Sequence, residues 1–292
     1  MKKKKEKNLK CGIVSILGFP NAGKSTFMNN ILKKKISIIS SKVQTTRNAI
    51  KGILTNERDQ LIFIDTPGLT LTKSYLNRKM SKSIYNSIIQ SNINLLMYDT
   101  STEITKIRKN LFLKLIDKKK KNFLVLNKVD KVNKHNLLKI SKELNSIYNF
   151  DETFYISALK KTGFDDLLLH LRRNIPKGVW LYNNKETTDQ KLEFTLSEIT
   201  REKIFQLMNQ EIPYSVTIES KIIKKSNIIK IFQTIFVNKK SQKPILLGKN
   251  GNKIKEIGIR ARKDIEKKLS KKIYLDILIS VDNKHQKNYE NY

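Results

Sequence analysis

The stretch Gly18-Phe19-Pro20-Asn21-Ala22-Gly23-Lys24-Ser25 decides the fold of the first half of the chain. It matches the pattern GxxxxGK[ST] and lies between a predicted strand, Ile13–Leu17, and a predicted helix, Ser25–Lys33. In this pattern the glycines let backbone N–H groups curl around a phosphate, while the lysine neutralises charge at the β and γ positions. The serine supplies an oxygen to Mg²⁺ at the positive end of the helix. The motif predicts a nucleotide site formed by Gly18, Asn21, Ala22, Gly23, Lys24, Ser25 and Thr26, and it leaves adenine and guanine open.

Short apolar runs alternate with amphipathic stretches from residue 11 to about residue 173. This alternation predicts an α/β fold, a P-loop domain with a mainly parallel sheet over residues 11–173. The expected strands are Ile13–Leu17, Ala49–Leu54, Leu61–Ile64, Ile93–Tyr98, Phe123–Leu126 and Thr153–Ile156. The expected helices are Ser25–Lys33, Tyr75–Gln90, Ile104–Ile116, Asn136–Tyr148 and Phe164–Arg173.

The tetrapeptide Asn127-Lys128-Val129-Asp130 indicates which base is bound. It follows a predicted strand at the carboxyl edge of the sheet, where ligands bind in such folds. A carboxylate accepts two hydrogen bonds, and guanine offers N1–H and an exocyclic amine, whereas the same edge of adenine offers no paired donors. Asp130 therefore predicts guanine. We expect Asn127 to connect the base loop to the phosphate loop and the Lys128 stem to cover the base.

The catalytic and metal-binding residues are expected around the γ-phosphate. Asp65 ends a predicted strand and starts Asp65-Thr66-Pro67-Gly68, so it is placed to hold Mg²⁺ through water, and Gly68 can approach the phosphate. In the loop Gln44-Thr45-Thr46-Arg47 we favour Thr46 over Thr45 as a Mg²⁺ ligand. The predicted metal ligands are thus Ser25, Thr46 and Asp65, and the predicted catalytic residues are Lys24, Thr46 and Gly68. Ser157 and Ala158, after the last strand, are expected to offer a backbone N–H to guanine O6.

The C-terminal part predicts a second, α+β domain over residues 190–282, after a Pro-, Gly- and Asn-containing linker at 174–189. Expected are a helix near Gln190–Met208, β-rich runs at Tyr214–Lys221 and Ile228–Val237, a helix near Asn252–Leu269 and a strand near Ile273–Val281. The tetrapeptide Gly248-Lys249-Asn250-Gly251 opens the second helix. This order indicates a type II KH domain, whose two glycines let the backbone close on about four single-stranded nucleotides. The candidate RNA contacts are Gly248, Lys249, Asn250, Gly251, Lys253 and Arg260.

Composition limits the function classes. The chain has 292 residues and a formal net charge of +33, and a lysine-rich composition is also what an AT-rich genome produces without any ligand. The residues at 238–272 nevertheless hold 13 basic and 3 acidic residues, a focused excess that suits an anionic partner. A single cysteine, Cys11, excludes an internal disulfide and favours the cytoplasm. No apolar run suggests a membrane span or a signal peptide.

Together the segments GFPNAGKST, KISIISSKVQTTR, DTPGL, NKVD and SAL resemble the Era family of bacterial GTPases, and so do REKIFQLMNQEIPYSVTIE and GKNGNKIKEIGIRARKDIE. The resemblance implies a Mg²⁺-dependent, monomeric GTPase that binds the 3′ end of 16S rRNA, assists assembly of the small (30S) ribosomal subunit and associates in part with the inner membrane. Leu69 stands where the best-known small GTPases carry a water-orienting glutamine. In relatives with such a replacement a K⁺ ion bridges the phosphates, held in part by the asparagine at the position of Asn21, although Asn21 could instead only stabilise the loop.

Two alternatives stay open at this stage. Because Leu69 cannot orient water, the protein could be a GTP-gated RNA-binding module with negligible hydrolysis. It could also be a related GTPase that acts on tRNA, but such a protein should carry a modification domain with a catalytic cysteine, and Cys11 is the only cysteine. The Lys-rich segment Met1–Lys10 is expected to be solvated, with contact to a membrane surface as the other reading.

Overall fold

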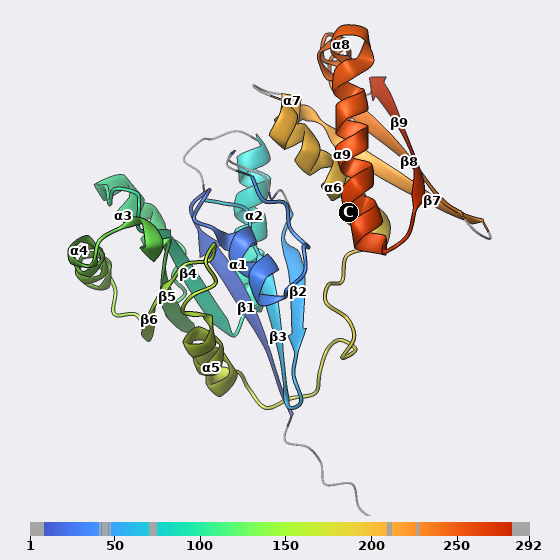
Figure 1. The fold of residues 1–292 in the computed structure, drawn as a ribbon. Helices are drawn as coiled ribbons and strands as arrows, with labels where there is room; N and C mark the ends of the chain where they lie inside the picture. Colours follow the sequence, from blue (N-terminus) through green and yellow to red (C-terminus); the bar gives the residue numbers. More distant parts are fainter. Residues whose placement is uncertain are drawn as a thin grey trace, which may run out of the picture. The chain divides into compact units, whose positions relative to one another are not determined.

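The computed structural model describes residues 9–40, 42, 46, 48–69, 75–208, 212–225 and 228–281, and in 75–79 and 225 the backbone only. The chain divides into two compact units, Met1–Asp189 and Gln190–Tyr292 (Figure 1). Among the described residues, no helix combines the length and apolar character that crossing a bilayer requires. Residues Gln44, Thr45 and Arg47 of the first-switch loop, together with most of Met1–Lys10, lie outside the described residues.

A six-stranded sheet forms the centre of the first unit, in the order β2-β3-β1-β4-β5-β6. Its strands are β1 (Lys10–Gly18), β2 (Ile50–Thr55), β3 (Asp59–Asp65), β4 (Ile93–Asp99), β5 (Lys121–Asn127) and β6 (Glu152–Ile156). The edge strand β2 is antiparallel to β3, and the other neighbours are parallel. The expected α/β class and all six expected strands are therefore confirmed, with ends that differ by up to three residues.

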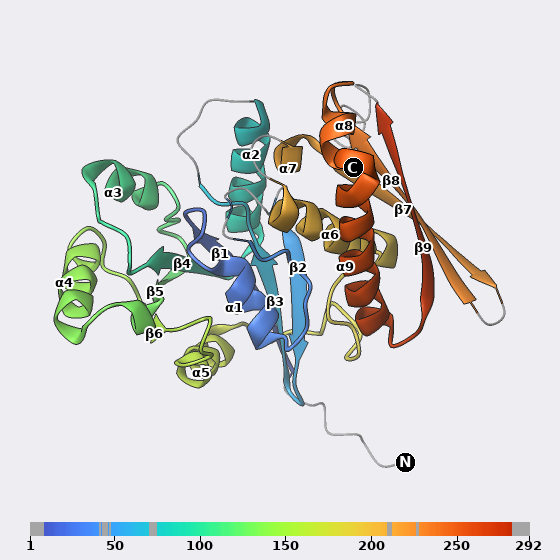
Figure 2. The same cartoon turned by 45° about the horizontal axis from the view of Figure 1, so that its top comes forward.

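Helices cover both faces of this sheet (Figures 1 and 2). The helices are α1 (Lys24–Ile31), α2 (Tyr75–Gln90), α3 (Lys106–Leu113), α4 (Lys134–Asn145) and α5 (Phe164–Asn174), and a short 3₁₀ turn, η1 (Val129–Lys131), follows β5. Side chains of α2, α3 and α4 share one buried apolar cluster with β1, β4 and β5. On the other face Phe27 of α1 packs edge-on against Phe63 of β3 and Phe164 of α5. The carboxyl ends of the parallel strands lie at one edge of the sheet. At this edge the phosphate loop follows β1 and the base loop follows β5.

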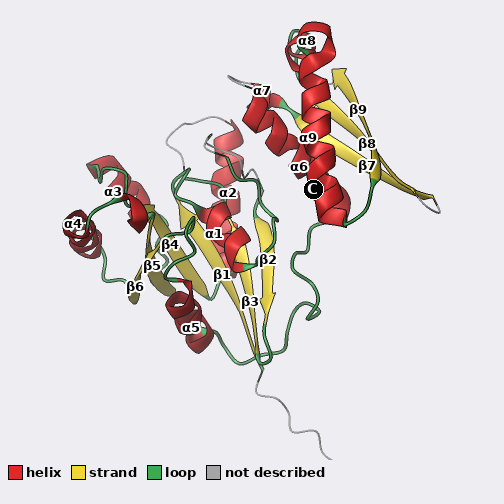
Figure 3. Cartoon of the chain, viewed as in Figure 1, coloured by secondary structure: helices red, strands yellow, loops and turns green. Residues whose placement is uncertain are grey.

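The predicted linker is not a free connection. Residues 175–189 form the long loop after α5, green in Figure 3, and this loop hydrogen-bonds to the sheet of the first unit. The N–H of Cys11 donates to Pro176 O (3.1 Å), and the N–H of Ile53 donates to Thr187 O (3.0 Å). The linker was predicted from its turn-forming residues. Such residues do not show whether a loop is hydrogen-bonded to a neighbouring strand. The domain limits 11–173, 174–189 and 190–282 stay predictions.

The second unit pairs a three-stranded sheet with helices. Its elements are α6 (Leu192–Leu207), α7 (Ile212–Ser215), β7 (Thr217–Lys225), β8 (Ile228–Val237), α8 (Gln242–Leu247), η2 (Lys249–Gly251), α9 (Asn252–Leu269) and β9 (Ile273–Val281). Strand β8 is antiparallel to β7 and parallel to β9, which is the expected type II KH arrangement. The predicted strand Tyr214–Lys221 was wrong at its start, because Ile212–Ser215 forms a helical turn in which Ser215 Oγ donates to Ile212 O.

Candidate functional site

The phosphate loop joins β1 to α1 and closes on the lysine side chain. Lys24 Nζ donates to the carbonyls of Gly18 (3.2 Å) and Phe19 (2.9 Å), and only 6% of the residue is exposed. Burial lowers the pKa of Lys24 to about 8, although Asp65 opposes the shift. Gly23 has a φ of +95°, and a Cβ there would lie 2.2 Å from Asn127 Nδ2, so glycine is required. The loop thus places a cation beside backbone N–H groups, an arrangement that suits a phosphate.

Three oxygen-bearing side chains meet next to this loop. Ser25 Oγ donates to Asp65 Oδ2 (2.7 Å), and Thr46 Oγ1 lies 3.2 Å from Ser25 Oγ and 3.5 Å from Asp65 Oδ2. Asp65 is fully buried, and its other oxygen, Oδ1, has no hydrogen-bond partner among the described residues. Burial raises the pKa of Asp65, with Lys24 as the largest opposing influence. Two hydroxyls and a carboxylate with an unsatisfied oxygen form a donor set that suits Mg²⁺.

The base loop is connected to the phosphate loop by Asn127. Its Nδ2 donates to Ala22 O (2.7 Å), as expected, and its Oδ1 accepts from the N–H of Ala158 (2.8 Å). Ser157 N–H donates to Thr162 O. Both N–H groups after β6 therefore have acceptors within the protein, and the predicted donation to guanine O6 would require a shared or exchanged hydrogen bond.

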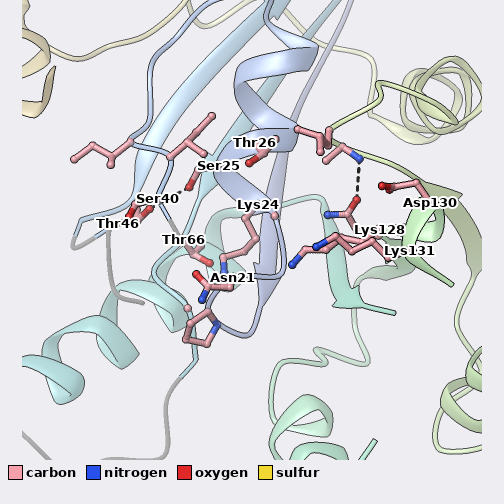
Figure 4. Close-up of a pocket in the computed structure, with 18 residues that line it drawn as sticks. Asn21, Lys24, Ser25, Thr26, Ser40, Thr46, Thr66, Lys128, Asp130 and Lys131 are labelled. Carbon is pink, nitrogen blue, oxygen red and sulfur yellow. Dashed lines mark hydrogen bonds between the residues drawn. The ribbon is translucent and has the colours of Figure 1, made fainter. Parts of the chain in front are cut away.

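Asp130 stands at the far end of the cavity from Ser25 and Thr46 (Figure 4). A hydrogen bond from the Ser157 side chain is the largest cause that lowers the pKa of the Asp130 carboxyl, and Lys160 and Lys131 contribute. The group is therefore ionised at neutral pH. Its Oδ1 is a buried atom with no hydrogen-bond partner among the described residues. An ionised carboxylate with an unsatisfied oxygen can accept hydrogen bonds from a ligand such as guanine.

A single cavity of ≈ 470 Å³ connects these groups. The sequence-predicted residues that line it are Asn21, Gly23, Lys24, Ser25, Thr26, Thr46, Gly68, Asn127, Lys128, Asp130 and Ala158. Four predicted residues are buried and do not line the cavity, namely Gly18, Ala22, Asp65 and Ser157. The wall also contains residues that the sequence motifs did not single out, namely Pro20, Ile38, Ile39, Ser40, Thr66, Lys131 and Leu159. Leu69 is not among the lining residues, because its side chain packs against the apolar cluster that includes Tyr98 and Phe112.

Sequence reasoning missed Asp99, which ends β4 next to the base loop. Its Oδ2 forms an ion pair with Lys128 Nζ, and its Oδ1 accepts from the N–H (3.0 Å) and hydroxyl (2.6 Å) of Ser101. Asp99 is 9% exposed, so the carboxylate is held in one place. The available signal was its position after a buried strand at the ligand edge of the sheet. The ion pair aligns the Lys128 stem with the cavity wall.

We expect Asp99→Asn to weaken GDP binding about fivefold, because a partly exposed ion pair contributes roughly 1 kcal/mol and the amide keeps the shape without the charge. Equilibrium titration with a fluorescent GDP derivative measures the effect. The control is Glu143→Gln, which breaks a more exposed ion pair with Lys109 outside the cavity and should leave GDP affinity unchanged. An equal effect of both variants would remove Asp99 from any role at the base loop.

The second unit presents the other predicted site at the start of α9. Gly248, Asn250 and Gly251 all have positive φ values (70°, 53° and 74°), so the backbone turns sharply before the helix. Lys249 and Asn250 are exposed, and Ile257 belongs to the buried core with Ile254 packed against it. Lys253 Nζ donates to Leu207 O (3.4 Å) at the end of α6. Arg260 pairs with Glu256 one turn earlier, so this guanidinium already has a partner within the helix.

The phosphate loop, the acidic base loop and the GxxG helix define a P-loop GTPase with a type II KH domain. Residues 13–128 match a family described as 50S ribosome-binding GTPase, and residues 211–286 match the KH domain family. GTPase Era of Afipia carboxidovorans is 37% identical over 274 residues, which cover 93% of this chain and 89% of that protein. The chain therefore belongs to the Era family of GTPases.

Solved structures agree over the whole chain. Era in complex with MgGDPNP and nucleotides 1506–1542 of 16S ribosomal RNA superposes with a TM-score of 0.90 and 32% identity. An alanine variant of Aquifex aeolicus Era bound to GDP·AlF4⁻ gives a TM-score of 0.90 and 33% identity. In both cases the match covers 97% of each chain. The expected family, fold class and enzyme class, a GTPase, are confirmed.

Proposed function

We propose that this GTPase binds the 3′ region of 16S rRNA in a GTP-dependent manner and assists assembly of the 30S ribosomal subunit. The proposal rests on two features that occur in one chain. One is a nucleotide cavity in which the Asp130 carboxylate suits guanine, and the other is an exposed GxxG turn. A relative that matches 97% of this chain was crystallised with MgGDPNP and nucleotides 1506–1542 of 16S rRNA. That relative supports the choice of RNA, and the residues of this chain support the chemistry.

In the nucleotide site, we assign the base to Asp130 and Lys128 and the phosphates to the loop that ends in Lys24. Mg²⁺ fits Ser25, Thr46 and Asp65, because these residues converge within 3.5 Å and leave Asp65 Oδ1 unsatisfied. When bound, the ion would neutralise charge on the β- and γ-phosphates. Lys24 adds positive charge on the other side, and the Gly68 backbone lines the same part of the cavity.

In the RNA site, we assign the nucleotide backbone to the turn Gly248–Gly251, with Lys249 as the nearest cation. The N-terminus of α9 favours phosphate, because its first N–H groups have no acceptor within the helix. Lys253 has a long stem, and within the described part of the chain its ammonium makes one long hydrogen bond, to Leu207 O, which it can exchange for a phosphate. Arg260 would first have to leave Glu256, which makes it the weakest of the assigned contacts.

The cellular part of the proposal follows from the family. We propose a monomeric protein of the cytoplasm that meets the ribosomal subunit there, with peripheral contact to the inner membrane as a secondary association. The GTPase acting on tRNA is disfavoured, because the two matched families account for the nucleotide and RNA domains and neither is a tRNA-modification domain.

Potassium should accelerate GTP hydrolysis by this chain. Leu69 is packed away from the cavity, so it cannot orient water, whereas Asn21 lines the cavity beside Lys24 and is placed to help hold a monovalent cation. We expect hydrolysis to be at least fivefold faster in KCl than in NaCl at equal ionic strength, about 1 kcal/mol of barrier. Asn21→Ala should abolish the difference.

Single-turnover phosphate release in the two salts, with and without the rRNA 3′-end oligonucleotide, measures this effect. Asn110→Ala, an exposed asparagine of α3 outside the cavity, is the matched control and should keep the salt difference. Equal rates in both salts would reject the potassium site. Absence of turnover in every condition, despite GTP binding, would favour the GTP-gated RNA-binding module.

A further inference from the structure

In the loop that leads from the GTPase domain to the RNA-binding domain, Leu181 and Tyr182 are held by a buried side chain, Gln60 of β3. Its Oε1 accepts from the N–H groups of Leu181 and Tyr182, both at 3.0 Å, and its Nε2 donates to Tyr182 O at 2.9 Å. The same Nε2 donates to Thr55 Oγ1 of β2 (3.0 Å). Gln60 is completely buried. One amide therefore joins β2, β3 and the connecting loop.

The end of the same loop is attached to the edge strand β2. Thr187 O accepts from the N–H of Ile53 (3.0 Å), and Thr188 Oγ1 donates to Lys51 O (2.8 Å). The Lys51 ammonium lies 3.6 Å from Asp189 Oδ2 and 3.4 Å from the Tyr182 hydroxyl. The loop therefore follows β2 as far as Asp189, the last residue of the first unit.

One of these two strands ends in a residue assigned to Mg²⁺, and the other begins shortly after a second one. Strand β3 ends in Asp65, and β2 begins at Ile50, four residues after Thr46. Ile50 and Asp65 face each other in the antiparallel register, and the Gly52 position on β2 also bridges to Thr188. The loop is therefore attached to the same strand pair whose ends lie next to Thr46 and Asp65. Packed strands respond as rigid elements, and such elements can carry coupling between sites.

We propose that Gln60 is a positioning residue that couples the nucleotide state to RNA binding, by fixing the connecting loop to the β2–β3 pair, in which β3 ends at Asp65 and β2 begins four residues after Thr46. The inference rests on the proposed GTP-dependent binding of rRNA. Gln60 touches neither nucleotide nor RNA in this scheme. Its role is to keep the loop attached to the two strands as far as Asp189, the last residue of the first unit. Coupling of this kind is a free energy shared by both sites, so RNA must change GTP affinity by the same factor as GTP changes RNA affinity.

The test compares RNA affinities in two nucleotide states. The full chain is titrated with an oligonucleotide that corresponds to nucleotides 1506–1542 of 16S rRNA, once with GDP and once with GDPNP. We expect the two dissociation constants to differ at least fivefold in the parent, the lower end of typical allosteric coupling. In Gln60→Ala the ratio should fall below twofold, while the affinity for GDPNP without RNA stays within twofold of the parent.

Two further variants distinguish a loss of coupling from a general loss of stability. Thr188→Val removes the hydroxyl bond to Lys51 O at the far end of the loop and should lower the ratio in part without disturbing the core. Asn94→Ala removes a buried amide of β4 that bonds Ser91 and Asn122 and does not contact the loop, so it should cost stability but keep the ratio. Loss of the ratio in Asn94→Ala to the same extent would show that general destabilisation is responsible and would overturn the inference.

The outcomes separate this inference from the proposed function. If the parent binds the RNA with a nucleotide-dependent affinity and Gln60→Ala keeps the full ratio, only the role of Gln60 is rejected. If the parent does not bind the RNA, or binds it equally in both states, the proposed GTP-dependent function is rejected, and the coupling with it.

Discussion

Asp130→Asn should lower the affinity for GTP by more than a hundredfold and raise the affinity for xanthosine triphosphate. Asp130 is ionised, and its Oδ1 has no partner among the described residues. A carboxylate in this state can accept from N1–H and the exocyclic amine of guanine. Hydrogen bonds to charged groups contribute roughly 1.5–3 kcal/mol each. Loss of both bonds should therefore cost about 3 kcal/mol or more, which exceeds the roughly 2.8 kcal/mol that corresponds to a hundredfold change in affinity. The asparagine amide can instead donate to the 2-oxo group of xanthine.

Competition of GTP, XTP and ATP for a labelled GDP measures the change in preference. Asp166→Asn is the matched control, because this exposed aspartate of α5 contacts His170 and does not line the cavity. The control should keep full preference for GTP. A folded Asp130→Asn protein that still selects GTP over XTP would remove Asp130 from base recognition and leave the base to the backbone around Ala158.

The parts of the site that could be predicted from sequence are those encoded by a short run of residues. The phosphate loop needs a strand, a glycine turn and a helix in succession, so the motif specifies both chemistry and local fold. Asn127 followed the same logic, and its bond to Ala22 O was expected. Asp99 was not predicted as a site residue, because its partner, Lys128, lies 29 residues further along the chain and no local pattern connects the two.

The contacts of the connecting loop could not be predicted from the sequence either, because they join residues still further apart in the chain. Turn-forming residues at 174–189 indicated a linker, yet Gln60 binds this loop from a position 121 residues earlier. Gln60 precedes the predicted strand Leu61–Ile64 and follows Arg58 and Asp59, so no local pattern marks it as a buried amide that must find partners. Its partners could not be named without the sheet register and the path of the loop. Donation from the Ser157 or Ala158 N–H group to guanine O6 stays a prediction, and the acceptors of these groups at Thr162 and Asn127 could not be named from the sequence.

Replacing Lys249 and Asn250 with aspartate should lower affinity for the 16S 3′-end oligonucleotide about a hundredfold, roughly 2.8 kcal/mol. Both side chains are exposed on the turn before α9, so the change places negative charge where the nucleotide backbone would enter and leaves the core around Ile257 untouched. GTP binding should survive, because the nucleotide cavity belongs to the other unit.

The decisive comparison is with Lys271→Asp combined with Lys272→Ala, which makes the same change in net charge just beyond the C-terminal end of α9. Non-specific attraction depends on total charge and weakens as salt rises, so both variants should lose this component alike. Only the Lys249 and Asn250 variant should also lose the specific contacts of the turn with the RNA. Its RNA affinity should therefore stay below that of the control variant throughout a KCl series in filter binding. If the two variants bind equally at every salt concentration, the GxxG turn is not the RNA site. The basic residues at 238–272 would then act only through their summed charge.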